Sequence, residues 1–301
     1  MFANFAVKYH HSMKVAGFTF VRNGVKFDYP FIEAIQSILP ICDELIVAVG
    51  YSEDDTRKKI EAINSPKIKI IDTIWDDSLR EGGHVLAVET NKALDAVSAD
   101  ADWCFYVQGD EVFHENDLPK IKAAMLEHLD NSKVQGLVFK HINFFATYDY
   151  EADSRGWVKN EVRVIRNDKQ IRSWKDAMSF RKNGAKLKCT FVDASIYHYG
   201  WVKHPKKQSE KRKEFDKLWH DDKYIKEQHQ ADEFDYSTID SLTKFTGSHP
   251  AVMKERIEKM NWHFDFNPKK IKPRKLKHKI VEMLEKMTGK ELWRFKNYEL
   301  A

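Results

Sequence analysis

The stretch that organises the chain is Trp103-Cys-Phe-Tyr-Val-Gln-Gly-Asp-Glu-Val-Phe-His-Glu115. Its apolar and aromatic first half is typical of a buried strand. The run then changes abruptly to Gly109, Asp110 and Glu111. Parallel strands of open α/β sheets present their ligand sites just beyond their carboxyl ends. Two acids there, behind a flexible glycine, suit a hard cation that carries phosphate oxygens. The alternative is a strand followed by an acidic surface turn.

The composition indicates a globular protein. With 301 residues, of which 42% are hydrophobic, the chain can bury a core and form one large domain with an appendage, or two domains. The net charge of +4 comes from 50 bases against 46 acids, so it identifies no partner. Cys42, Cys104 and Cys189 have no CxxC spacing. They indicate buried, reduced thiols rather than a zinc site or a disulfide framework.

Localisation is predicted from two features of the sequence. No apolar run approaches about 18 residues, so we expect no membrane-spanning helix. The first residues lack the basic and apolar regions of a signal peptide, and residues 1–12 are expected to precede the fold. We expect a cytoplasmic protein, either free or at the inner face of the membrane.

Strands and helices alternate through the first 115 residues. Strands are predicted over 14–21, 44–50, 67–71 and up to 108, and helices over 30–39, 57–63 and 85–97. This alternation predicts a parallel, doubly wound sheet with helices on both faces. The sequence contains no G-x-G-x-x-G or Walker pattern, which disfavours a dinucleotide-binding fold or a P-loop.

The predicted elements change in kind after Trp201. Before it, strands are predicted over 136–145, 161–166 and 191–201, and a helix over 118–129. Beyond them charged residues increase, and helices are predicted from 203, over 238–245, over 250–260 and over 274–287, with a basic linker at 267–273. We therefore divide the chain into an α/β domain at 1–202 and a helical, basic region at 203–301.

Three segments carry a family resemblance. The second strand ends Val49-Gly50-Tyr51-Ser52-Glu53-Asp54-Asp55-Thr56, a later helix carries Glu89-Thr90-Asn91, and the fourth strand ends Val107-Gln108-Gly109-Asp110-Glu111. This succession resembles the GT-A fold of family 2 glycosyltransferases. The segments 18–24 and 197–201 are similar to a bacterial subgroup of that family, and the resemblance covers roughly residues 14–205. It implies an α/β, mostly parallel sheet flanked by helices, with nucleotide-sugar and acceptor binding in residues 1–202.

Two departures from the family pattern stand out. Gln108 occupies the position of the family's first metal-binding acid. Gly50 and Tyr51 replace the acid pair that usually meets the nucleotide base. Tyr51 could stack on a base instead; an exposed loop tyrosine is the alternative.

The resemblance implies a reaction and its partners. A sugar would move from a nucleotide-diphosphate donor to an acceptor hydroxyl, with inversion, in cell-surface polysaccharide or glycoconjugate synthesis. The acceptor would be a saccharide or a lipid-linked saccharide, and a divalent cation, Mn²⁺ or Mg²⁺, would assist. The donor-binding candidates are Arg22, Tyr51, Asp54, Asn91, Gln108 and Asp110.

The metal candidates follow from the same resemblance. Asp110 would be the direct ligand, Glu111 its partner, and His198 a third ligand or a phosphate contact. A lone histidine in an aromatic run is otherwise a hydrogen-bonded core residue. Arg22 would contact phosphate or pair with a loop acid.

An inverting transfer needs a base for the acceptor hydroxyl. Asp176, beside Trp174, lies where the family's base would fall, and Asp153 is the rival. Trp174, Trp201 and Tyr199 could form an aromatic platform for the acceptor; ordinary core packing is the alternative.

The basic C-terminal region has several possible partners. Residues 266–297 hold eleven Lys and Arg against three Glu. A basic amphipathic helix there could lie on an anionic membrane, dock on its own domain, or form a homodimer. The functional alternatives to a transferase are a degenerate nucleotide-sugar-binding protein of the same fold, and a membrane-surface or nucleic-acid-binding module. The membrane-surface or nucleic-acid-binding module ranks last among these hypotheses, and nucleic acid is not expected as a partner.

Overall fold

The first half of the chain builds a parallel sheet. The computed structural model describes residues 12–264, 266, 276–288, 292 and 294–301. The parallel strands lie in the order β3-β2-β1-β4, with bounds β1 (Val15–Val21), β2 (Glu44–Gly50), β3 (Ile68–Thr73) and β4 (Trp103–Tyr106). β2 is buried along its whole length, which is expected of a strand whose sheet is covered on both faces.

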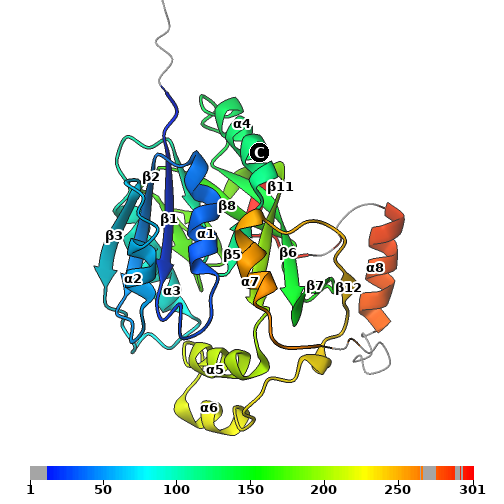
Figure 1. Cartoon of the computed structure of the whole chain (residues 1–301). Helices are drawn as coiled ribbons and strands as arrows, with labels where there is room; N and C mark the ends of the chain where they lie inside the picture. Colours follow the sequence, from blue (N-terminus) through cyan, green and yellow to red (C-terminus); the bar gives the residue numbers. More distant parts are fainter. Residues whose placement is uncertain (1–11, 265, 267–275, 289–291, 293) are drawn as a thin grey trace, which may run out of the picture.

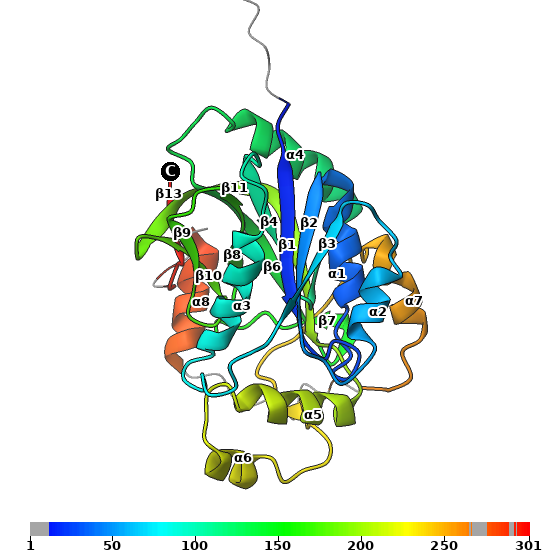
Figure 2. The same ribbon diagram turned by 90° about the vertical axis from the view of Figure 1, so that its left-hand side faces the viewer.

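Helices cover both faces of these strands (Figures 1 and 2). α1 (Phe31–Ile38) and α2 (Thr56–Glu61) share one core with α4 (Leu118–Glu127). α3 (His84–Asp95) packs into the core on the opposite face. The predicted α/β class, a sheet flanked by helices, is confirmed. The three cysteines are free and buried, as predicted.

The second half of the sheet is mixed. β8 (Asn160–Arg166) is antiparallel to both β4 and β6 (Gly136–Phe145), and β6 is parallel to β11 (Ala185–Trp201). The other strands of this half are β5 (Glu111–Phe113), β7 (Thr147–Glu151), β9 (Ile171–Trp174) and β10 (Ser179–Lys182). β5 pairs antiparallel with β11, and this short ladder places the turn after β4 beside the end of β11.

The described elements after residue 202 lie on several sides of the sheet (Figure 1). α5 (Pro205–Asp216) and α6 (Asp222–Gln228) lie below the carboxyl ends of the parallel strands (Figures 1 and 2). The 3-10 turn η4 (Ala251–Met253) leads into α7 (Lys254–Glu258), which packs near α1, while α8 (Leu276–Thr288) lies on another side. β12 (Thr243–Lys244) pairs with β7, and β13 (Tyr298–Leu300) pairs with β11.

The helix predicted over 238–245 is wrong. A 3-10 turn, η3 (Tyr236–Thr238), and the two-residue strand β12 occupy this segment. Pairing with the edge of β7 satisfies its backbone, and the Thr243 hydroxyl donates to the Asp153 carboxylate at 2.8 Å. Tertiary contacts therefore override the local helical pattern. The predicted extension at 1–12, apart from its last residue, and the linker at 267–273 lie outside the described residues.

No helix among the described residues combines the length and the apolar character needed to cross a bilayer.

The terminal strand β13 provides a test of the fold. Tyr298 is 3% exposed, belongs to the core that contains α3, and meets the Phe191 ring edge-on at 5.6 Å. Tyr298→Ala should lower the free energy of unfolding by about 3 kcal/mol, because it leaves a cavity in this core. Glu299→Ala is the control, since Glu299 is exposed. Urea unfolding measures both; equal effects would show that β13 does not close the core.

Candidate active site

A cleft of about 730 Å³ opens at the carboxyl ends of the parallel strands. Its walls come from the end of β1, the turn between β4 and β5, strands β6, β8 and β11, and helix α5. This is the edge of an α/β sheet where ligands usually bind. The predicted residues that line it are Arg22, Gln108, Asp110, Glu111, Asp176, His198 and Trp201.

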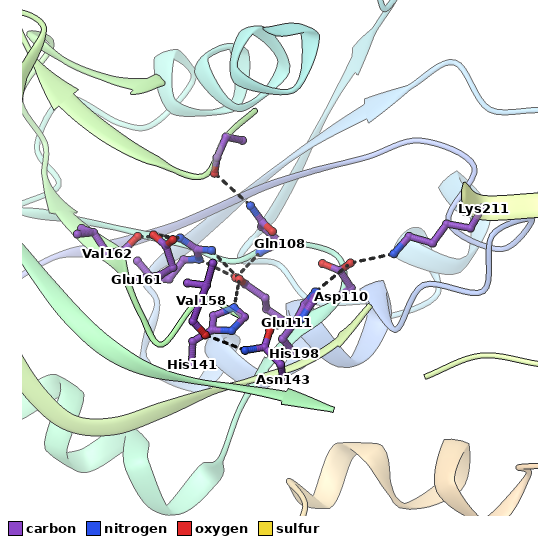
Figure 3. Close-up of polar contacts among 12 residues, drawn as sticks. Gln108, Asp110, Glu111, His141, Asn143, Val158, Glu161, Val162, His198 and Lys211 are labelled. Carbon is purple, nitrogen blue, oxygen red and sulfur yellow. Dashed lines mark hydrogen bonds and ion pairs between the residues drawn. The ribbon is translucent and has the colours of Figure 1, made fainter. Parts of the chain in front are cut away.

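Asp110 and His198 line the cleft side by side (Figure 3). In the β5–β11 ladder Glu111 is paired with His198, and the Tyr199 N–H donates to the Asp110 carbonyl at 2.8 Å. These contacts bring Asp110 Oδ2 to 3.6 Å from His198 Nε2. A Cβ on Gly200 would lie 2.5 Å from each of those two atoms. Glycine at this position therefore leaves space for the pair.

Asn143 orients the His198 ring. The Asn143 Nδ2 donates to the Val158 carbonyl at 2.8 Å, which turns its Oδ1 toward His198 Nδ1 at 3.1 Å. His198 Nδ1–H then donates to Asn143, and Nε2 is the nitrogen that faces Asp110. An imidazole fixed in this way through its second nitrogen is the usual arrangement of a metal-binding histidine.

Positive charge surrounds Asp110. Lys211 of α5 places Nζ 3.4 Å from Asp110 Oδ2 and donates to the Gly200 carbonyl at 2.8 Å. Burial would raise the pKa of Asp110, but His198 and Lys211 outweigh it and hold that pKa well below its usual range. Asp110 is therefore an anion across the physiological pH range.

Glu111 is held from behind by Arg163. Arg163 Nε donates to Glu111 Oε2 at 2.7 Å, and its Nη2 donates to Oε1 at 2.6 Å. His141 Nε2 lies 3.3 Å from the same Oε1. Burial would raise the pKa of Glu111, but Arg163 lowers it to about 2. Both oxygens are thus engaged, and Glu111 fixes the turn that carries Asp110.

Two donor candidates lie in the cleft with local partners. Arg22 pairs with Asp77 at 2.6 Å and stacks over the Trp75 ring at 5.3 Å. Arg22 thus makes the loop ion pair that the sequence left open, while it still lines the cleft. Gln108 donates through Nε2 to the Ala177 carbonyl at 3.1 Å. This hydrogen bond connects the turn after β4 to the loop that contains Ala177.

Two further donor candidates, on the loop after β2, do not line the cleft. Tyr51 is 74% exposed. The Asp54 carboxylate accepts from the backbone N–H groups of Lys26 and Thr56, at 2.6 and 3.0 Å. Asp54 therefore holds the loops after β1 and β2 against each other.

Asn91 and Trp174 also lie outside the cleft lining. Asn91 Oδ1 accepts from the Ser173 N–H at 2.9 Å and so joins α3 to β9. The Trp174 ring is covered by the Arg181 guanidinium at 4.2 Å. Both contacts support the sheet that forms one wall of the cleft.

The acceptor-side candidates are divided. Asp176 lines the cleft, and burial raises its pKa. The rival Asp153 does not line it and accepts hydrogen bonds from Ser241 and Thr243. Trp201 is part of the cleft wall, whereas Tyr199 is 1% exposed and packs in the core.

Sequence reasoning missed Asn143, Arg163 and Lys211. Asn143 and His141 alternate with apolar residues along β6, and that period-two polar pattern was an available signal. Arg163 alternates in the same way within β8. Lys211 gave no signal, because α5 is rich in lysines and only packing shows which of them enters the cleft.

The residues fit a divalent cation that is shared with a ligand. Among the described residues, no group of three or more His, Cys, Asp and Glu side chains is arranged to hold a metal ion. Asp110 and His198 supply two donors that face each other over Gly200. Mg²⁺ typically takes one or two protein ligands and completes its shell with phosphate oxygens and water. Such a cation would be held only when a phosphate ligand is present.

Comparisons with known proteins give distant structural similarities. The sequence matches no family model and no curated protein. The structure is similar to that of S. aureus TarS 1–349 in complex with UDP (TM-score 0.42, 16% identity, covering 67% of this chain and 64% of that one). It is also similar to M. tuberculosis glucosyl-3-phosphoglycerate synthase with Mn²⁺, UDP and phosphoglyceric acid (TM-score 0.29, 19% identity, covering 44% of this chain and 43% of that one). A third similar structure is that of the mannosyltransferase PcManGT from Pyrobaculum calidifontis with GDP-Man and Mn²⁺ (TM-score 0.32, 16% identity, covering 42% of this chain and 35% of that one). The matched part spans 39 to 64% of the TarS chains.

Glu161 is a buried acid in the cleft wall. It is 4% exposed, and its Oε2 lies 3.7 Å from Arg163 Nη1. Burial raises the pKa of Glu161 to about 8. The folded protein therefore holds a proton on Glu161 that the unfolded chain has lost, over the range from about pH 5 to about pH 8.

The raised pKa predicts a pH-dependent effect of Glu161→Gln. A carboxyl with a raised pKa destabilises the fold increasingly as pH rises toward that value, and a glutamine does not ionise. The melting temperature of the variant relative to wild type should therefore increase from pH 5 to pH 8. Glu127→Gln, at an exposed position of α4, should show no such trend. A constant difference for Glu161→Gln would contradict the assignment.

Proposed function

We propose that the chain is a glycosyltransferase that moves a sugar from a nucleotide-diphosphate donor to an acceptor hydroxyl. The observation that carries the proposal is the Asp110–His198 pair, held 3.6 Å apart over Gly200 at the ligand-binding edge of the sheet. The resemblance to family 2 glycosyltransferases in the segments around these residues supports it independently.

A divalent cation, Mn²⁺ or Mg²⁺, would be held by Asp110 and His198 together with the donor diphosphate. When bound, such a cation acts as a Lewis acid that neutralises the charge of the leaving diphosphate. The chain itself adds Lys211, which already lies beside Asp110, and Arg22, which lines the same cleft. Both can attract phosphate oxygens from fixed positions, which reduces the cost of reorganisation in the transition state.

Asp176 is the proposed base. Its carboxylate would accept the proton of the acceptor hydroxyl as that oxygen attacks the sugar carbon and the bond to the diphosphate breaks. A base works best when its pKa approaches the working pH, and burial shifts the pKa of Asp176 in that direction. Inversion follows if the acceptor attacks from the side opposite the diphosphate, as the family resemblance implies.

The wider setting of the reaction is also a proposal. The resemblance implies a saccharide or lipid-linked saccharide as acceptor, in cell-surface polysaccharide or glycoconjugate synthesis. Work at the inner face of the membrane would bring the protein to a lipid-linked acceptor.

The first test is a thermal-shift panel of UDP, GDP, CDP and dTDP sugars, each with and without Mn²⁺. A ligand that binds only the folded state raises the melting temperature by mass action. We expect one nucleotide to stabilise the protein only when metal is present, and Asp110→Asn to lose that effect.

Asp193→Asn is the matched control for Asp110→Asn. The Asp193 side chain is 97% exposed and pairs with Lys120, so this variant should respond like wild type. An unchanged metal-dependent shift in Asp110→Asn would refute the central assignment. Binding without any release of sugar would favour the degenerate, nucleotide-sugar-binding alternative that Gln108 and Gly50 suggest.

Asp176→Asn tests the base. With the nucleotide sugar identified by the panel, its hydrolysis by water reports turnover without a known acceptor. Asp176→Asn should lower kcat by about 100-fold or more, because general base catalysis contributes that much. Donor KM should change by less than about threefold if Asp176 contacts no phosphate.

Asp153→Asn should retain wild-type hydrolysis, since Asp153 does not line the cleft. Weakened donor binding in Asp176→Asn would move this residue from the base role to donor recognition. A kcat loss in Asp153→Asn and none in Asp176→Asn would exchange the two assignments.

A further inference from the structure

Helix α8 exposes an apolar stripe. Ile280, Met283 and Met287 are 48%, 56% and 75% exposed. Their spacing of three and four residues places them on one side of the helix. α8 lies at the periphery of the molecule (Figures 1 and 2). Three neighbouring apolar side chains in water indicate an interaction surface.

The opposite side of α8 is attached to the protein body. Glu285 pairs with Arg155 at 2.6 Å and with Arg294 at 3.2 Å, and it accepts from the Leu292 N–H at 3.0 Å. At 3.6 residues per turn, Glu285 lies roughly 140–160° around the helix from the stripe residues. The ion pairs therefore fix α8 with its apolar stripe directed away from the body.

The part of the sequence that contains this helix has a surplus of bases. Residues 266–297 contain eleven Lys and Arg against three Glu. The remainder of the chain carries more acids than bases, because the whole chain has only 50 bases against 46 acids. Basic character is thus concentrated in the segment that contains the exposed stripe.

We propose that α8 binds the surface of an anionic lipid bilayer, with its apolar stripe in the interface and with the surplus of bases in this part of the sequence adding electrostatic attraction. An apolar stripe combined with excess positive charge is the pattern of helices that lie in the plane of a membrane. Each basic residue near an anionic surface adds to the attraction, and salt weakens it.

The test is vesicle flotation with the full chain. Vesicles of equal parts phosphatidylcholine and phosphatidylglycerol are compared with phosphatidylcholine alone, at low and high salt. We expect binding to the anionic vesicles that salt weakens. The triple variant Ile280→Asp, Met283→Asp, Met287→Asp should bind at least tenfold more weakly, because three charges replace the apolar stripe.

The single variants Ile280→Asp and Leu126→Asp form a matched pair. Leu126 is 51% exposed on α4, so Leu126→Asp should bind vesicles like wild type while Ile280→Asp binds more weakly. Wild-type melting temperatures in all variants show that the fold is intact.

Three results would overturn the proposal. They are the absence of wild-type flotation, equal binding by the triple variant, and a wild-type dimer in light scattering that the triple variant loses. The last would assign the stripe to a second copy of the chain. None of these three results depends on sugar transfer, so the experiment tests membrane binding by α8 separately from the proposed activity.

Discussion

The antiparallel pairing of β5 with β11 is the contact on which the cleft depends. It is short, with three paired positions, yet it sets Asp110 beside His198. The two residues are 88 positions apart in sequence, and they come from a turn and from the end of a long strand. Position 200 requires glycine, because a Cβ there would meet both the Asp110 and the His198 side chains.

Buried charge keeps this ladder in place. Glu111 is fully buried and is held by two hydrogen bonds from Arg163. Removing one partner of such a pair typically costs about 3–5 kcal/mol, because the other charge remains buried. The arrangement contributes rigidity to the turn that carries Asp110, and a fixed carboxylate is what preorganised electrostatic catalysis needs.

The α5 helix extends the same principle. Lys203, just before the helix, is fully buried, donates to the Asp28 carbonyl, and has its pKa lowered by burial to about 7. Lys211 of α5 lines the cleft and lies beside Asp110, with Nζ 3.4 Å from Oδ2. One lysine of the region after β11 thus lines the cleft, and the other holds the loop after β1 through the Asp28 carbonyl. The helical region therefore belongs to the architecture of the cleft as well as to the surface.

Much of the fold could be predicted because β2 and β4 are continuous buried runs and because helical stripes lie between the early strands. β2 and β6 have the bounds that the sequence predicts. Asp110 could be singled out because it follows a strand-like run, and His198 because of the family resemblance in the segment 197–201. The hydrogen bonds by which Asn143 orients His198 and Arg163 holds Glu111 could not be predicted, because they depend on the register between strands. Packing also explains Gly50, which departs from the family pattern. A Cβ there would lie 2.5 Å from Trp75 Nε1, so this position requires glycine.

Anomalous diffraction at the manganese edge shows whether Asp110 and His198 hold a cation together with the diphosphate. Crystals would be soaked with Mn²⁺ and the nucleoside diphosphate that stabilises the protein in solution. We expect one anomalous peak within bonding distance of both an Asp110 carboxylate oxygen and His198 Nε2, in contact with the diphosphate. A diphosphate bound in the cleft with no peak at this pair, or a peak held by other residues, would contradict it.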